Sequence, residues 1–193
     1  RCDPGGHPWV GSLDRLGSTG NCALYRLNKS GLWEVVLAGI SLSNGMAWSP
    51  DGTRFYYVDT PTQRIDVFDF VDDRLANRQP LVRFSSAEGF PDGLTCDNEG
   101  HLWIALWGGA RVLRIHGRTG EHLAEISLPV SQVTSCIFGG PGNRTLFITT
   151  ARERLDEVSL QREPHAGSIF RIETQIQGQT SVLCTLPPPA RAC

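Results

Sequence analysis

Short apolar runs alternate with turn residues along this chain. Each of four segments has a glycine-containing turn followed by an apolar strand, then a second strand in which apolar and polar positions alternate. The turns begin at Asp3, Ser49, Asp97 and Gly139, and the second strands are expected at 23–27, 65–70, 112–115 and 168–172. The runs are rich in Val, Ile, Phe, Tyr and Trp, and no long stretch has a helical period. The pattern predicts an all-β protein.

The same pattern recurs at a nearly constant interval. A third strand is expected in each unit, at 33–37, 80–84, 123–128 and 181–186. The turn glycines Gly6, Gly52, Gly100 and Gly142 are 46, 48 and 42 residues apart. A period of about 45 residues with about four strands is typical of a β-propeller blade, and this chain has room for about four. We expect a partial β-propeller over residues 1–186 and a Pro-rich tail at 187–193, where proline cannot donate ladder hydrogen bonds.

Two loop motifs occupy the same place in consecutive repeats. Asn44, in a Ser-Asn-Gly sequence, lies eight residues before Gly52, and Asp92, in a Pro-Asp-Gly sequence, lies eight residues before Gly100. Equivalent positions of neighbouring repeats come together in a closed repeat fold. An amide oxygen and a carboxylate are ligands that hard divalent cations prefer. The spacing therefore predicts a metal site that contains Asn44 and Asp92.

Other residues near these positions have competing interpretations. Both tripeptides are also ordinary turn sequences, because Asn and Asp tolerate left-handed backbone beside Gly. Thr134 holds the equivalent position in the last repeat and is a weak ligand. Asp59 follows a strand, and a structural hydrogen-bonding role is favoured for it. Trp107 precedes two glycines at a strand end and is a candidate to line a substrate pocket, whereas Trp48 and Trp103 are expected in the core.

Composition excludes several classes of function. A net charge of −2 offers no basic surface for nucleic acid or an anionic membrane, and no apolar run is long enough to span a bilayer. The six cysteines are scattered without zinc-ligand spacing, which favours a reducing, cytoplasmic setting. Cys96 and Cys136 are expected to be small buried side chains. No Ser stands in a Gly-x-Ser-x-Gly elbow, which disfavours a serine hydrolase.

Several segments in register resemble the SMP-30/gluconolactonase/LRE, or regucalcin-like, family. The matching segments are 40–52, 55–60, 65–69, 90–97, 100–105, 108–112, 134–140 and 146–152. The resemblance implies a six-bladed β-propeller with one divalent metal ion in its central channel. Ca²⁺ is the first expectation for that ion, with Zn²⁺ or Mn²⁺ as alternatives. The implied reaction is hydrolysis of a small-molecule sugar lactone.

The resemblance also implies roles for particular residues. Asn44 and Asp92 match the family's metal ligands, and Asp92 matches its usual general base. A glutamate ligand would lie upstream of Arg1, so the chain is expected to lack N-terminal blades and by itself to bind metal weakly, with impaired activity. An open propeller edge also leads us to expect low stability. Two alternatives stay open, namely a calcium-binding regulatory protein and a non-catalytic propeller that serves as an interaction scaffold.

Overall fold

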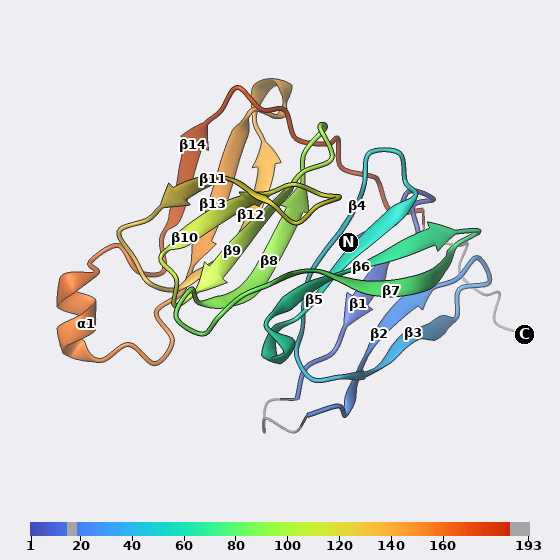
Figure 1. The fold of residues 1–193 in the computed structure, drawn as a ribbon, viewed down its shortest axis with the longest axis horizontal. Coiled ribbons are helices and arrows are strands. Elements are labelled where there is room, and N and C mark those ends of the chain that lie inside the picture. The colour runs from blue at the N-terminus through green and yellow to red at the C-terminus, as the bar shows by residue number, and fades with distance from the viewer. Residues whose placement is uncertain (15–18, 186–193) are drawn as a thin grey trace, which may run out of the picture.

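Each sheet of the protein is an antiparallel meander in which consecutive strands pair side by side (Figure 1). The computed structural model describes residues 1–14 and 19–185. The first two sheets contain β1 (Trp9–Gly11), β2 (Cys22–Leu27) and β3 (Trp33–Ile40), then β4 (Ser43–Trp48), β5 (Arg54–Asp59), β6 (Arg64–Val71) and β7 (Arg74–Arg83). The next two contain β8 (Phe90–Cys96), β9 (Leu102–Trp107), β10 (Arg111–Ile115) and β11 (His122–Ser127), then β12 (Val133–Gly139), β13 (Thr145–Thr150) and β14 (Ile169–Glu173).

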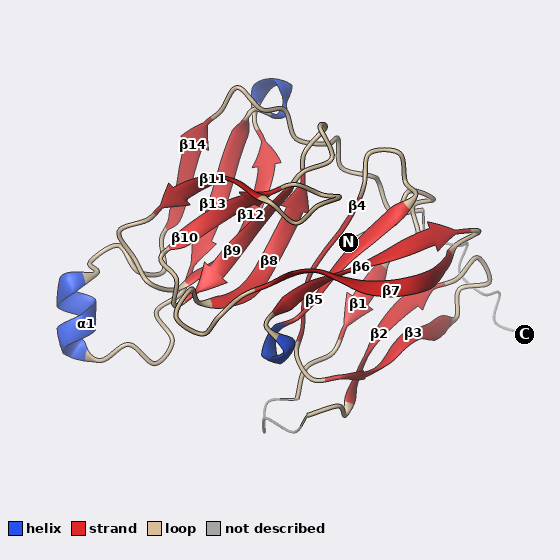
Figure 2. Ribbon diagram, in the orientation of Figure 1, coloured by secondary structure: helices blue, strands red, loops and turns tan. Residues whose placement is uncertain are grey.

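Within residues 1–14 and 19–185, helical structure lies in connections between strands (Figure 2). The 3₁₀ turns are η1 (Thr60–Thr62) and η2 (Pro141–Asn143), and the α-helix is α1 (Glu157–Arg162). Asp156 caps α1 by accepting a hydrogen bond from the Ser159 backbone N–H at 2.8 Å. None of the described helices is long and apolar enough to cross a bilayer.

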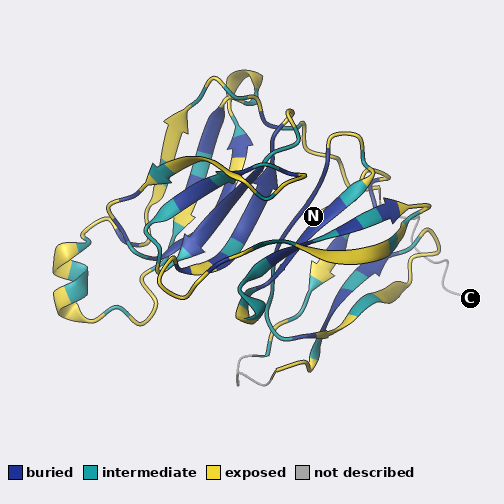
Figure 3. Ribbon diagram, viewed as in Figure 1, coloured by how far each residue is buried: buried dark blue, intermediate teal, exposed yellow. Residues whose placement is uncertain are grey.

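Apolar side chains fill the spaces between successive sheets. In β5, Phe55 and Tyr57 face the first sheet, whereas Tyr56 and Val58 face the third. This alternation follows from the two-residue period of a strand, and it buries both faces of β5. β9 is buried on both faces in the same way, because Ile104 packs toward the second sheet and Ala105 packs toward the last sheet. Figure 3 shows the burial on these middle strands, while the outer strands β3, β7, β11 and β14 are largely exposed.

The predicted all-β propeller repeat is confirmed, with four blade-like sheets. The first sheet begins one strand later than the others. Trp9 in β1 makes the same contact to an aspartate as Trp103 in β9, so β1 is equivalent to the second strand of the third sheet, and no counterpart of β4 or β8 lies among the described residues of the first sheet. Cys96 and Cys136 are buried, as predicted.

One predicted strand is wrong. Residues 181–185 of the strand expected at 181–186 form no strand in the structure. After β14 the chain is tied to other sheets, since Asn98 N–H, in the third sheet's first turn, donates to Gln177 O at 2.9 Å and Gln179 Nε2 donates to Trp48 O, in the second sheet, at 3.0 Å. These bonds direct the chain away from the edge of β14, so residues 181–185, despite their alternating pattern, have no strand to pair with. Residue 186 and the predicted tail at 187–193 lie outside the described residues.

Candidate active site

A β-bulge interrupts the innermost strand of the last three sheets at the same place. The strand pairing shifts around Asn44 in β4, around Asp92 in β8 and around Thr134 in β12. A bulge leaves one residue outside the regular ladder and redirects its side chain. Because β4 packs against β8 and β8 against β12, the three residues lie at the same end of adjacent strands. The structure thus brings together the positions that the repeat spacing related.

Glycines beside these residues allow the strands to approach closely. A Cβ atom at Gly45 would lie 2.6 Å from Asp92 O and 2.7 Å from Leu94 N. A Cβ atom at Gly93 would overlap the Ser135 side chain. The glycines of the Ser-Asn-Gly and Pro-Asp-Gly motifs therefore serve backbone packing between sheets, in addition to any turn preference.

Asn44 is held by a hydroxyl group at the end of β5. Its Nδ2 donates to Thr60 Oγ1 at 3.1 Å, and Thr60 Oγ1 donates to Pro91 O at 2.9 Å. No donor to Asn44 Oδ1 is found in the described part of the chain. The amide oxygen is consequently available to a ligand.

Asp92 is a half-buried carboxylate with no cationic side chain paired to it in the described structure. Loss of solvent raises the pKa of Asp92 to about 7, while hydrogen bonds from the Asn44 side chain and the Gly93 backbone N–H partly offset that effect. The fully buried carboxylates differ. Asp3, Asp66 and Asp97 are each paired with arginine, and Asp59 accepts backbone N–H groups. A divalent cation bound beside Asp92 would supply the positively charged partner that this carboxylate lacks.

Asp59 has the structural role expected of it. Its carboxylate accepts hydrogen bonds from the Ser41 and Leu42 backbone N–H groups, with the shortest distance 2.9 Å from Leu42. The Tyr57 hydroxyl donates to Ser43 Oγ at 2.7 Å. Together these contacts fix the entry to β4, immediately before Asn44.

Trp107 lies at the same end of the third sheet as Asp92. It pairs with Phe90 at the start of β8, and its side chain is half-buried, unlike those of Trp48 and Trp103, which are in the core as predicted. Thr134, in the next sheet, shares a 2.7 Å hydrogen bond with Thr149. The described residues at this end therefore combine oxygen-bearing side chains with two accessible aromatic rings, Trp107 and the exposed Phe90.

Two buried charge clusters were not predicted from the sequence. Asp3 accepts from Trp9 Nε1 at 3.0 Å and lies 3.2 Å from Arg26 Nε. In the third sheet, Asp97 accepts from Trp103 Nε1 at 2.9 Å and from Arg114 Nε at 2.9 Å. The signal was present in the sequence, because an aspartate precedes a tryptophan by six residues in both repeats.

The cluster around Asp3 also includes His7 and Asp73, and its ligand atoms are close enough to hold a metal ion. However, the Arg26 guanidinium already lies among them, 2.9 Å from Asp73 Oδ2 and 3.3 Å from His7 Nδ1. The positively charged Arg26 side chain therefore neutralises the Asp3 and Asp73 carboxylates. The matching arrangement at Asp97 and Arg114 marks this as a recurring structural ion pair.

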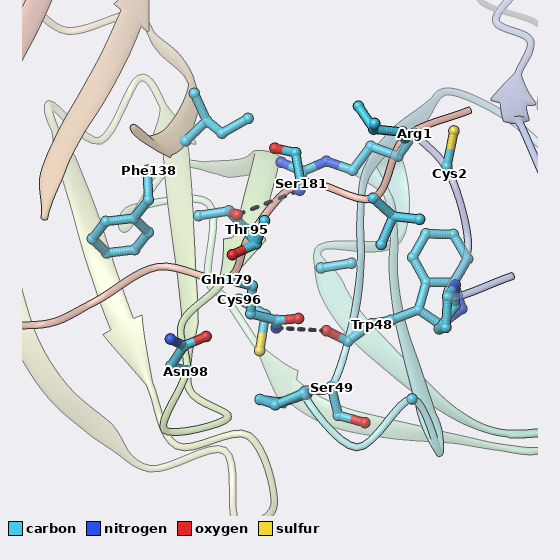
Figure 4. A pocket seen from close by; sticks show the side chains of 18 of the residues that line it. Arg1, Cys2, Trp48, Ser49, Thr95, Cys96, Asn98, Phe138, Gln179 and Ser181 are labelled. Carbon is cyan, nitrogen blue, oxygen red and sulfur yellow. Dashed lines mark hydrogen bonds between the residues drawn. The ribbon is translucent and has the colours of Figure 1, made fainter. Parts of the chain in front are cut away.

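A cavity of about 700 Å³ lies at the other end of the inner strands (Figure 4). Trp48, Cys96 and Phe138, near the ends of β4, β8 and β12, line it together with Arg1 and Gln179. Asn44 and Asp92 are at the opposite, starting ends of their strands. The cavity is therefore separate from the carboxylate–amide site.

Comparison with known proteins decides the family. The sequence profile of an SMP-30/Gluconolactonase/LRE-like region matches residues 1–152. The chain belongs to this family. It is 38% identical over 184 residues to a Bacillus subtilis protein named "Putative sugar lactone lactonase YvrE", with 94% of this chain and 63% of that protein covered. Rabbit (Oryctolagus cuniculus) regucalcin is 41% identical over 135 residues, which cover 69% of this chain and 45% of regucalcin.

Solved structures of the SMP-30/gluconolactonase/LRE family share the fold. A calcium-binding protein, regucalcin, from Agrobacterium tumefaciens superposes with a TM-score of 0.89 at 33% identity, covering 96% of this chain and 63% of that one. The chain thus spans less than two thirds of the length of each of these relatives.

Proposed function

We propose that this chain carries part of the active site of a divalent-metal-dependent lactonase, with Asn44 and Asp92 as metal ligands. The observation that supports this most is the partly buried Asp92 carboxylate, which has no cationic partner in the described structure and neighbours the Asn44 side chain, whose amide oxygen has no donor among the described residues. A neutral carbonyl oxygen and a carboxylate form a donor set suited to Ca²⁺, and also acceptable to Mn²⁺ or Zn²⁺. The family relationship supports the same assignment.

A divalent cation bound here would polarise a lactone carbonyl and make a nearby water more acidic. Asn44 contributes Oδ1 without adding charge, so the cation keeps more of its polarising power. Asp92 has a second role as the group that accepts the proton of the attacking water. Burial raises the pKa of Asp92 to about 7 in the metal-free protein, and a bound cation would favour the ionised form, which is the form that can accept a proton.

Trp107 is proposed to line the substrate pocket. Its half-buried ring lies at the Asp92 end of the third sheet, where it can pack against the apolar face of a sugar lactone ring. The substrate class we propose is a small sugar lactone, in line with the name of the Bacillus subtilis relative.

A direct test follows glucono-δ-lactone hydrolysis through acid release, with Ca²⁺, Mn²⁺ or Zn²⁺ added to metal-free protein. We expect hydrolysis above the spontaneous rate that depends on the metal and is lost in Asp92→Asn. A folded protein that binds metal without hydrolysing any of a panel of sugar lactones would contradict the enzymatic assignment. That outcome would instead favour a calcium-binding regulatory protein, the second candidate, which the name of the Agrobacterium tumefaciens relative supports.

A further inference from the structure

Thr60 joins the two strands that carry Asn44 and Asp92. It begins η1, directly after β5, and its hydroxyl lies between the Asn44 side chain in β4 and the backbone of Pro91 in β8. The contact therefore connects the second sheet with the third at the residue next to Asp92. A hydroxyl in this place influences both proposed ligands at once.

The hydrogen-bond directions around this hydroxyl fix the Asn44 amide. A hydroxyl has one proton, and Thr60 donates it to Pro91 O at 2.9 Å. Toward Asn44 the Thr60 oxygen can then only accept a hydrogen bond, so the NH₂ side of the amide must face it, at 3.1 Å. The Asn44 carbonyl oxygen is consequently turned away from Thr60.

This orientation matters because only the carbonyl oxygen of an amide can coordinate a cation. A rotated amide would present NH₂ to the cation and would set its carbonyl oxygen against the Thr60 oxygen, whose proton is already donated to Pro91 O. We propose that Thr60 is a positioning residue for the metal site, which selects the Asn44 rotamer able to bind a divalent cation. The inference rests on the proposed metal site and adds a residue outside its ligands.

Thr62 provides a matched control in the same turn. Its hydroxyl donates to Asp59 O at 2.7 Å and makes no contact with Asn44 or Asp92 that the described structure records. Thr62→Val and Thr60→Val each remove one hydroxyl from η1 and keep the branched shape. Thr60→Ser keeps the hydroxyl and removes a methyl group.

The test is a Ca²⁺ titration of the wild type and these three variants, followed by NMR on the Asn44 side-chain amide, whose signals are assigned by their loss in Asn44→Asp. Partners behind a metal ligand typically change affinity by about 10–100-fold, so we expect a loss of that size in Thr60→Val. Thr60→Ser and Thr62→Val should stay within about threefold of the wild type, because neither removes the hydroxyl that holds Asn44. In metal-free protein, the Asn44 amide signals should move in Thr60→Val alone.

Each outcome decides a separate point. Wild-type affinity in Thr60→Val, or an equal loss in Thr60→Ser, overturns the positioning role while the metal site stands. A wild type that shows no response to Ca²⁺ overturns the metal site and the role of Thr60 together. A Thr62→Val variant as weak as Thr60→Val also overturns the inference, since the loss would then come from the turn as a whole.

Discussion

Gly45 lies against the backbone of Asp92, with room for no side chain between them: an added Cβ would be 2.6 Å from the Asp92 carbonyl oxygen. The contact holds the bulges of β4 and β8 together, and with them the Asn44 and Asp92 side chains. The two motifs thus depend on each other across a boundary between sheets.

Gly45→Ala should therefore separate the two strands. We expect a loss of about 1–3 kcal/mol in the free energy of unfolding, as for other overpacked sites, together with weaker metal binding. Urea denaturation and Ca²⁺ titration measure the two effects. Gly139→Ala is the control, because its Cβ would meet only the Phe147 ring at 3.2 Å, at the far end of β12. Equal, small effects of both substitutions would show that the approach at Gly45 is unimportant.

The metal-free protein should become less stable as pH rises from about 4 to about 7. The pKa of Asp92 is raised from 3.8 to about 7 in the folded state, so in this window the folded protein holds a proton that the unfolded chain has released. Asp92→Asn should remove that contribution and flatten the slope. Urea denaturation at a series of pH values, with EDTA present, measures it.

Asp51→Asn is the control for this pH series. Hydrogen bonds from Ser49 and Thr53 lower the pKa of Asp51 to about 2, so its stabilising contribution is present above about pH 4 and is lost as pH falls toward 2. Its removal should leave the slope between pH 4 and 7 as in the wild type. A slope that persists in Asp92→Asn would mean that Asp92 ionises normally.

Asp97→Ala should destabilise the protein by about 3–5 kcal/mol, because it leaves the Arg114 guanidinium without its buried partner. Trp103 Nε1 loses its acceptor at the same time. Urea denaturation gives the loss, and the same experiment on Asp3→Ala tests the equivalent cluster with Arg26.

Measurements of Ca²⁺ affinity distinguish these buried ion pairs from the proposed active site. Asp3→Asn should leave Ca²⁺ affinity unchanged, since Arg26 already neutralises that cluster. Loss of Ca²⁺ binding in Asp3→Asn, with binding kept in Asp92→Asn, would move the metal site to the first sheet.

Trp107→Ala should raise the KM for a lactone substrate by about tenfold and change kcat little, as expected for a residue that contacts substrate without taking part in the reaction. Trp107→Phe should retain most of the affinity because it keeps an aromatic face. Steady-state kinetics on glucono-δ-lactone measures both variants. A fall in kcat at constant KM would place Trp107 in the chemistry instead of in substrate binding.

The repeat could be predicted from the sequence because both faces of the middle strands are buried, so each of these strands is a short, nearly continuous apolar run. The turn glycines and the runs of β5 and β9 recur at a fixed spacing, and that spacing also related Asn44 to Asp92. The strand predicted at 181–186 failed for residues 181–185, because pairing depends on where the chain goes after β14. Local alternation does not contain that information.

The hydrogen bonds that hold Asn44 in place were harder to predict. The bond from Asn44 to Thr60 spans 16 residues, and the bond from Thr60 to Pro91 spans 31 and crosses between sheets. The Asp3 and Asp97 clusters were overlooked for a different reason. Their aspartates begin turns, and the turn interpretation is correct but incomplete, since the same carboxylates also bind arginine.

The proposed metal site is tested most directly by a calorimetric titration of Ca²⁺, Mn²⁺ and Zn²⁺ into the metal-free wild type and Asp92→Asn. With few carboxylate ligands, Ca²⁺ affinity is expected at about 10⁻⁴ M or weaker. We expect saturable one-to-one binding in the wild type that disappears in a folded Asp92→Asn variant. Binding of equal strength in both proteins, or none in a folded wild type, would contradict the proposed site.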